Sequence, residues 1–136
     1  MVKIAFLQLL PSEDVKENME KGIEYCKEAK KLGADIALFP EMWSCGYHIP
    51  HDMKKLNELA IPADGEFVTC YAELAKELDM AIGITFLERC ESKPRNTICL
   101  YDRHGKSVYK YSKVHICNFG EAGDESVLCA GDEFTV

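Results

Sequence analysis

The sequence predicts an α/β fold with a mixed β-sheet and helices on one face. In the first 80 residues, apolar runs typical of buried strands alternate with amphipathic helical patterns, which indicates parallel strands joined by helical crossovers. Three more strand patterns then follow one another with only short polar turns between them, which indicates antiparallel hairpins. Parallel strands followed by hairpins together predict one mixed sheet.

The amino-terminal part predicts two strands joined by a helix. Residues 3–10 are mostly apolar, and Ser12 is a good N-cap for a helix that ends near Gly33. Residues 35–39 form a short continuous apolar run, and the strand–helix–strand order predicts that the two strands are parallel. The buried stripe of the helix recurs every three to four residues, at Val15, Met19, Ile23 and Cys26.

A loop and two more helices follow the second strand. Pro40 cannot extend a sheet ladder, so we expect the chain to leave the sheet there and form a loop over residues 41–50. Residues 52–60 predict a short helix, and residues 62–65 a turn. A second helical stripe comes next, made of Phe67, Val68, Tyr71, Leu74, Ala75 and Leu78.

The remaining sequence predicts three strands over residues 80–87, 97–102 and 107–111. Residues 118–132 have the composition of a loop, and residues 133–136 predict the start of another strand. Because the chain ends inside that pattern, we expect residues 1–136 to be a single domain that is truncated.

Composition and charge exclude several classes of protein. The formal net charge of −7 carries no block of lysine and arginine, which argues against a nucleic-acid partner. The apolar amino-terminal run is too short to cross a membrane, and no signal peptide is evident. The seven cysteines are odd in number and form no Cys-x-x-Cys pair, so we expect reduced thiols and a cytoplasmic location.

Two charged residues stand where α/β folds place their chemistry, at the ends of strands. Glu41 follows the apolar run directly after Pro40, and Lys113 follows the last hairpin strand. We expect their side chains to converge on one site. Asn96 comes just before a predicted strand, where it either caps a turn or supports that site.

A metal site is the other reading of the first loop. Cys45, His48 and His51 are spaced by three residues, as ligands on one helix face would be. Gly46 and Pro50 make a regular helix improbable there, and no fourth ligand is offered. We therefore expect no metal.

Five short segments occur in the order of one family's motifs: Lys3–Gln8, Gly33–Trp43 with Gly46 and Tyr47, Arg95–Thr97, Tyr111–His115 and Ala130–Phe134. Through them the chain resembles the nitrilase (carbon–nitrogen hydrolase) superfamily. The resemblance implies an αββα sandwich, of which this chain would hold half to two-thirds. It also implies hydrolysis of a non-peptide carbon–nitrogen bond in a small amide, carbamoyl compound or nitrile.

The resemblance also implies a Glu-Lys-Cys catalytic set that needs neither a metal nor an organic cofactor. Glu41 would be the general base for the thiol, and Lys113 would stabilise the oxyanion. A second glutamate is implied on the loop after the lysine. We choose Glu125 because its distance from Gly131 suits that loop, and Glu121 is the alternative.

Three further residues would lie close to the substrate in such an enzyme. The resemblance places Trp43 and Tyr47 on the loop that borders the substrate site, where they would form a pocket wall or pack beneath it. Asn96 would take a supporting place beside them.

The family's nucleophilic cysteine has no counterpart in the sequence. It belongs to a segment like Gly-x-x-Ile-Cys-Tyr-Asp, whereas Ile116-Cys117-Asn118 lacks the glycine and follows Lys113 too closely. We expect the nucleophile to lie outside this chain, and the chain alone to be inactive. We then expect the chain either to form a homo-oligomer or to pair with a missing carboxy-terminal half. The competing readings are a non-catalytic binding or interaction module built on a degenerate hydrolase half, or chemistry by Cys117 itself.

Overall fold

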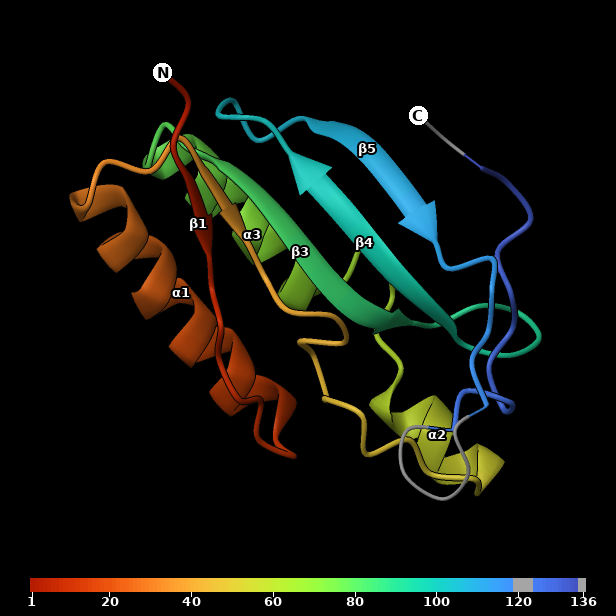
Figure 1. Cartoon of the computed structure of the whole chain (residues 1–136). Coiled ribbons are helices and arrows are strands. Elements are labelled where there is room, and N and C mark those ends of the chain that lie inside the picture. The colour runs from red at the N-terminus through yellow and green to blue at the C-terminus, as the bar shows by residue number, and fades with distance from the viewer. Residues whose placement is uncertain (119–123, 135–136) are drawn as a thin grey trace.

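The computed structural model describes residues 1–118 and 124–134 and contains five strands and three helices within those residues (Figure 1). The elements in chain order are β1 (Ile4–Phe6), α1 (Val15–Lys31), β2 (Ile36–Leu38), α2 (Met53–Leu59), α3 (Glu66–Glu77), β3 (Ala81–Glu88), β4 (Arg95–Tyr101) and β5 (Ser107–Ser112).

The strands form one sheet in the order β1-β2-β3-β4-β5. β1, β2 and β3 run parallel, and β4 and β5 continue the sheet as antiparallel neighbours. Parallel neighbours need a crossover connection, and helices do lie between β1 and β2 and between β2 and β3. Antiparallel neighbours need only a turn, and no helix lies between β3, β4 and β5. The predicted mixed α/β sheet is therefore confirmed.

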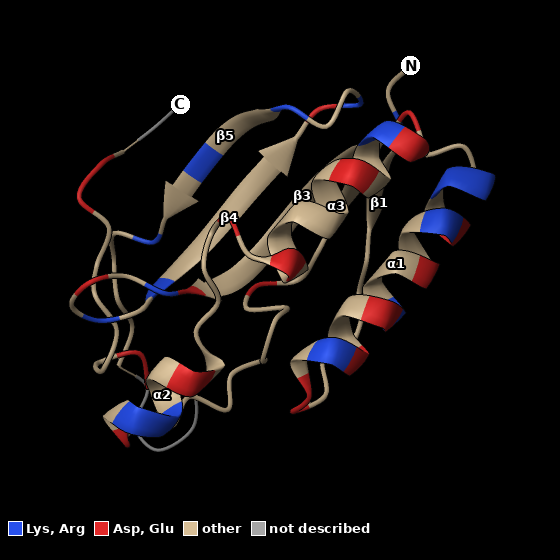
Figure 2. Ribbon diagram, turned by 180° about the vertical axis from the view of Figure 1, so that it is seen from behind, with Lys and Arg blue, Asp and Glu red and all other residues tan. Residues whose placement is uncertain are grey.

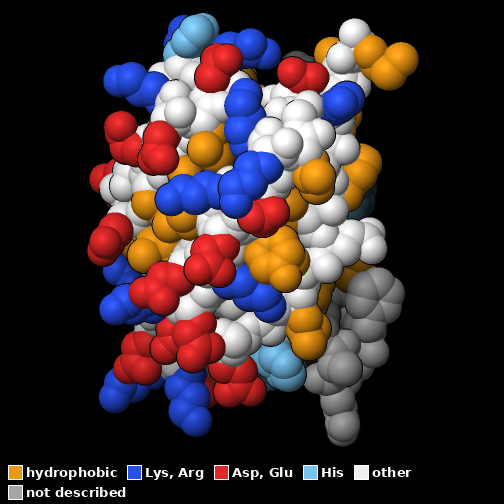
Figure 3. Space-filling model, turned by 90° about the vertical axis from the view of Figure 1, so that its left-hand side faces the viewer, with side chains coloured by type: hydrophobic (Ala, Val, Ile, Leu, Met, Phe, Trp, Pro, Cys, Tyr) orange, Lys and Arg blue, Asp and Glu red, His pale blue; other side chains and the backbone are white. Residues whose placement is uncertain are grey.

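Helices α1 and α3 cover one face of this sheet (Figure 2). α1 buries Cys26 and Ala29 on its inner side, while α3 buries Tyr71 and packs against β3. Charged side chains cover the outer surface of α1, as Figure 3 shows. The amphipathic patterns in the sequence therefore predicted the buried sides of α1 and α3 correctly, and these two helices lie on one side of the sheet.

The other face of the sheet is turned to the viewer in Figure 1, and none of the described helices covers it. Side chains alternate across a strand, so this face carries Ile4 and Phe6, which are 48% and 70% exposed. Leu38, Ile98 and Leu100 share the face and are half-buried. We call these five residues the open face.

A second hydrophobic cluster lies at the end of the sheet, where α2 meets the segments that follow β2 and β5 (Figure 1). Leu56 of α2 is fully buried there, next to Met42, Leu87 and Leu128. This cluster joins the loop that carries Glu41 to the segment after β5.

Two predicted boundaries were wrong for local reasons. The first strand ends at Phe6 instead of residue 10, because its neighbour β2 ends at Leu38 and the N–H of Leu7 makes the last bond to that residue. The helix N-cap is Asp14, whose carboxylate accepts from the N–H of Glu17 at 2.9 Å, and not Ser12.

The carboxy-terminal expectation was also wrong for the described residues, since residues 133 and 134 form no strand; residues 135 and 136 lie outside the described part. Among the described residues, no helix combines the length and the apolar character that crossing a membrane requires.

Candidate active site

Glu41 is presented by a loop that β3 holds on both sides. The hydroxyl of Thr85 donates to the carbonyl of Pro40 and accepts from the N–H of Trp43 at 3.1 Å. Met42 between them has a φ of 58°, a left-handed conformation that is uncommon for a side chain of this kind. The chain therefore turns sharply after Glu41, and about half of the Glu41 side chain remains exposed.

Lys113 follows β5 directly and is held by its backbone on two sides. Its N–H donates to the carbonyl of Asn96 at 2.8 Å, and its carbonyl accepts from the N–H of Gly131 at 2.8 Å. Next to Gly131, the carboxylate of Asp132 forms an ion pair of 3.2 Å with Arg95 of β4, which connects the segment around Gly131 to this strand. Lys113 and Asn96 thus stand opposite each other at the end of the antiparallel pair.

Glu125 is fully buried next to Lys113. Its N–H donates to the carbonyl of Cys117 at 3.0 Å, and its Oε2 accepts from the N–H of Cys117 at 3.0 Å. These two bonds fix the carboxylate against the segment that follows β5. The alternative second glutamate, Glu121, lies outside the described residues.

The four side chains form a closed ring of hydrogen bonds. The Nζ of Lys113 donates to Oε1 of Glu41 at 2.9 Å and to Oε2 of Glu125 at 2.9 Å. The Nδ2 of Asn96 donates to Oε1 of Glu41 at 2.7 Å and to Oε1 of Glu125 at 2.8 Å. Glu41 and Lys113, separated by 72 residues, therefore converge on one place, with Glu125 and Asn96 beside them.

The ring sets the charge of its members. Burial alone would raise the pKa of Glu41, but hydrogen bonds from Tyr47, Lys113 and Asn96 outweigh it and lower that pKa below its usual value. Burial alone would lower the pKa of Lys113, yet its bonds to Glu125 and Glu41 raise it well above the usual value. At neutral pH Glu41 is thus a carboxylate that can accept a proton, and Lys113 is a cation.

Tyr47 lies at the open side of this ring. Burial and its hydrogen bond to the Glu41 carboxylate raise the pKa of the Tyr47 phenol, so it stays a donor. Its side chain is 40% exposed, which leaves it in reach of a ligand next to Glu41. The substrate-contact prediction for Tyr47 stays a prediction.

Trp43 lies away from the ring and packs in the core, which is one of its two expected places, and its contact with a substrate stays a prediction. The turn at Met42 directs the indole into the helix-covered core, where it is fully buried. It packs on Phe39 with a centroid distance of 5.3 Å, and its Nε1 lies 3.4 Å from the Tyr71 hydroxyl. Gly22 of α1 makes room for it, because a Cβ there would lie 2.9 Å from Nε1.

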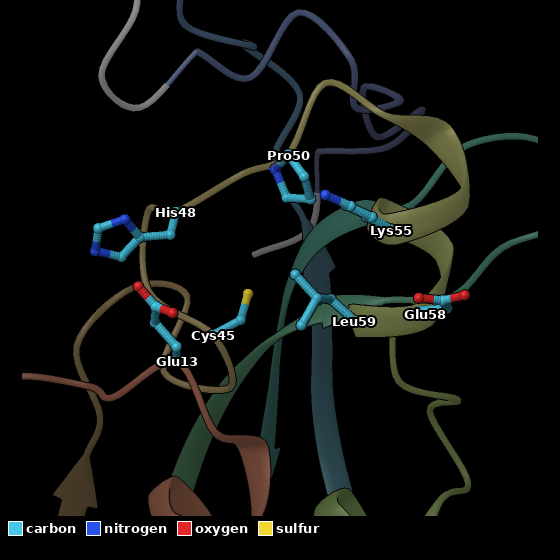
Figure 4. A pocket seen from close by; sticks show the side chains of 7 residues that line it. All are labelled: Glu13, Cys45, His48, Pro50, Lys55, Glu58 and Leu59. Carbon is cyan, nitrogen blue, oxygen red and sulfur yellow. The ribbon is translucent and has the colours of Figure 1, made fainter.

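Cys45, His48 and His51 do not converge. Cys45 and His48 line a cavity of about 480 Å³ between the loop and α2, whose other wall carries Lys55 (Figure 4). His51 is turned to Asp124 instead, at 3.3 Å. Within the described residues, no group of three or more side chains is arranged to hold a metal ion.

Cys117 touches the ring through its backbone. Its N–H bonds to Glu125, while its Sγ lies 3.8 Å from the carbonyl oxygen of His115. The thiol is therefore directed to its own segment in this arrangement.

Thr85 is the site residue that the sequence reasoning missed. It is the only hydroxyl in the apolar run of β3, and it lies on the strand face opposite Ile84 and Phe86, which face the helices. A single polar side chain in a buried strand needs a hydrogen-bond partner, which here is the loop around Glu41. That interruption was the signal in the sequence.

A mixed sheet with a glutamate–lysine–glutamate cluster at its end presents groups that can move a proton and stabilise an anion. The family model described as carbon-nitrogen hydrolase matches residues 3–132, and the chain belongs to this family. It is 27% identical over 140 residues to the omega-amidase NIT2 of Bos taurus, and 28% identical over 116 residues to the N-carbamoylputrescine amidase of Oryza sativa. These matches cover 98% and 85% of this chain, but only 49% and 38% of the relatives.

Solved structures share the fold. The NitFhit protein of C. elegans superposes with a TM-score of 0.81 at 21% identity, over 98% of this chain and 35% of that protein. The chain therefore spans between 35% and 49% of the length of these three proteins.

Proposed function

We propose that this chain supplies the glutamate–lysine–glutamate part of an enzyme that hydrolyses a carbon–nitrogen bond in a small amide or carbamoyl compound. The nucleophile in this proposal is a cysteine outside the 136 residues. The observation that carries the proposal is the ion-paired ring, in which Lys113 bonds to Glu41 and Glu125 at 2.9 Å each.

Glu41 serves as the general base in this proposal. Its ionised carboxylate accepts the thiol proton as sulfur attacks the carbonyl carbon, and it returns that proton to the nitrogen when the carbon–nitrogen bond breaks. Water then attacks the carbonyl carbon of the thioester and gives a proton to Glu41. The carbon–sulfur bond breaks to release the acid, and Glu41 returns the proton to the cysteine thiolate.

Lys113 stabilises the oxyanion in the same proposal. An ammonium has three N–H donors, and the ring uses two of them on glutamates, which leaves a third for the substrate oxygen. Glu125, buried and bonded to the Cys117 N–H, keeps the ammonium in place. The cation also favours the thiolate form of a nearby cysteine.

The open face supports the part of the proposal in which the cysteine nucleophile comes from outside the 136 residues. Asn96 shares that sheet face with Ile98 and Leu100, so the ring lies at the rim of an apolar surface. Exposed apolar surface of this kind favours a covering partner. A further protein segment on the open face would bring a cysteine close to Glu41 and Lys113. Nitriles, the third substrate class of the family, use the same nucleophile and stay within the proposal.

Turnover tests the proposal. The chain is co-expressed with the coding sequence downstream of it, and ammonia release is measured on a panel of amides, N-carbamoyl amines and nitriles. We expect activity that falls by about a hundredfold or more in Glu41→Gln and in Lys113→Met. Glu13→Gln and Lys55→Met, which alter the separate cavity, serve as matched controls. Turnover that survives both ring substitutions would rule the mechanism out, and a complex that binds amides without turnover would favour the binding module.

A further inference from the structure

Asn96 connects all three charged residues of the ring. Its Nδ2 bonds to Glu41 and to Glu125, and its backbone carbonyl accepts from the N–H of Lys113. The side chain is 5% exposed, so these bonds are made almost without water. Both hydrogens of the amide are used inside the ring, and the expectation that Asn96 supports the site next to the substrate stays a prediction.

The orientation of this amide follows from its neighbours. An amide nitrogen carries two hydrogens, and each points at a carboxylate oxygen here, at 2.7 and 2.8 Å. The opposite orientation would place the amide oxygen against Glu41 and Glu125, where acceptors face acceptors. The two hydrogens of one NH₂ group diverge at a fixed angle, so they also fix the separation of the two carboxylates.

Two carboxylates and one ammonium leave one excess negative charge in the ring. Lys113 compensates it from one side, and Asn96 is a neutral donor on the other side. In the part of the chain that the structure describes, the Tyr47 hydroxyl also bonds to Glu41 and the Cys117 N–H also bonds to Glu125. Of these four groups, Lys113 and the Asn96 amide are the two that bond to both carboxylates. Without the amide, Lys113 would have to hold the two carboxylates together against their mutual repulsion with no second bridging group from this set.

We propose that Asn96 is a positioning residue that clamps Glu41 and Glu125 at a fixed separation on either side of Lys113. It touches no reacting atom. Asn96 and Lys113 both bond to Oε1 of Glu41, so neither of them occupies the second oxygen of that carboxylate. The role of this clamp in turnover rests on the proposed function, whereas the hydrogen bonds that form the clamp do not depend on it.

Carboxyl-carbon NMR titration of the full chain, labelled at glutamate Cδ, tests the clamp without any turnover. The Glu41 signal is assigned with Glu41→Gln. In the unsubstituted chain, we expect both side-chain amide protons of Asn96 to shift as Glu41 takes up its proton. Amide protons that ignore this titration would overturn the proposal, and this readout is taken on the unsubstituted chain, with Glu41→Gln needed only for the assignment.

Substitutions measure the size of the effect. Asn96→Asp replaces the donor by a third carboxylate of the same shape, and Asn96→Ala removes the donor. We expect the Glu41 titration midpoint to rise by about one pH unit or more in both, since a hydrogen bond to a charged group is lost. Asn57→Asp, which adds the same charge on the exposed surface of α2, is the matched control and should leave the midpoint unchanged. A midpoint that stays fixed in folded Asn96→Ala would contradict the clamp.

Turnover in the assembled enzyme separates this proposal from the proposed function. There we expect Asn96→Ala to lower kcat while KM changes less, and to move the acid limb of the pH profile upward. An enzyme that is active through Glu41 and Lys113 but unaffected by Asn96→Ala would refute the clamp alone. An inactive assembly would refute the proposed function, and the NMR titration would still decide on the clamp.

Discussion

The Lys113→Met variant removes the ammonium that bonds to both glutamates of the ring. The donors to Glu125 that remain among residues 1–118 and 124–134 include the Asn96 amide and the Cys117 N–H, and no cation is among the bonds given for it there, although its side chain is fully buried. Most of the loss in the free energy of unfolding comes from leaving this buried carboxylate without its cation. Glu41 is about half exposed, so water compensates most of its loss.

The size of the loss follows from the burial of the pair. Removing one partner of a buried ion pair destabilises a protein by about 3–5 kcal/mol. Lys113 keeps 24% of its side chain exposed, which lets water screen part of the interaction and places the loss at the lower end, about 3 kcal/mol. That is a large share of the roughly 5–15 kcal/mol that stabilises an ordinary domain.

Urea unfolding at pH 7, followed by circular dichroism, measures the change. We expect the midpoint of Lys113→Met to fall by about 1–3 M, and the double variant Lys113→Met/Glu125→Gln to recover part of it because the unpaired charge is gone. Lys16→Met is the matched control: its partner Glu20 is 3.9 Å away and both are exposed, so the loss should stay below about 0.5 kcal/mol. Equal losses in Lys113→Met and Lys16→Met would refute the reasoning.

Three further expectations concern pH, packing and the open face. Because the folded chain lowers the pKa of Glu41, its carboxylate stabilises the fold above the unfolded pKa of about 4.3 and loses that effect as the pH falls through the folded pKa. Urea titrations should therefore show a difference between wild type and Glu41→Gln at pH 7 that begins to shrink near pH 4.3 and disappears below the folded pKa of Glu41; a difference that does not shrink below about pH 4.3 would contradict this. Gly22→Ala places a Cβ 2.1 Å from the Tyr71 hydroxyl and should cost about 1–3 kcal/mol in thermal denaturation, whereas an unchanged Tm would show that the core has room. Phe6→Ser should reduce binding of a hydrophobic dye while changing stability by less than about 0.5 kcal/mol, and undiminished dye binding would count against an exposed apolar face.

The architecture was predictable from the sequence because burial leaves a periodic record. A helix that buries one side gives a stripe every three to four residues, as in the patterns that end near Gly33 and Leu78. A strand that is buried on both faces gives a continuous apolar run, as before Pro40. The order of the elements along the chain then indicates which strands pair in parallel and which in antiparallel. The end of β1 was not predictable, since residues 7–10 are apolar but lose their strand partner when β2 stops. Ser12 and Asp14 are both good caps two residues apart, and only the bond to the Glu17 N–H distinguishes them.

The convergence of Glu41 and Lys113 was predictable because both follow strands that end at the same edge of the sheet. The direction of Trp43 was not, because it depends on the left-handed backbone at Met42 and on the space above Gly22. The bond of Asn96 to two carboxylates was equally hidden, since the partners lie 55 and 29 residues away.

Hydrogen-bond scalar couplings between the Lys113 side-chain nitrogen and glutamate carboxyl carbons test the central claim most directly. The measurement uses ¹⁵N- and ¹³C-labelled chain at low temperature, where the ammonium protons exchange slowly. Two bonds of 2.9 Å predict cross-peaks from Lys113 to both Glu41 and Glu125. A freely rotating ammonium with a coupling to neither carboxylate would contradict the ion-paired site on which the proposed hydrolysis depends.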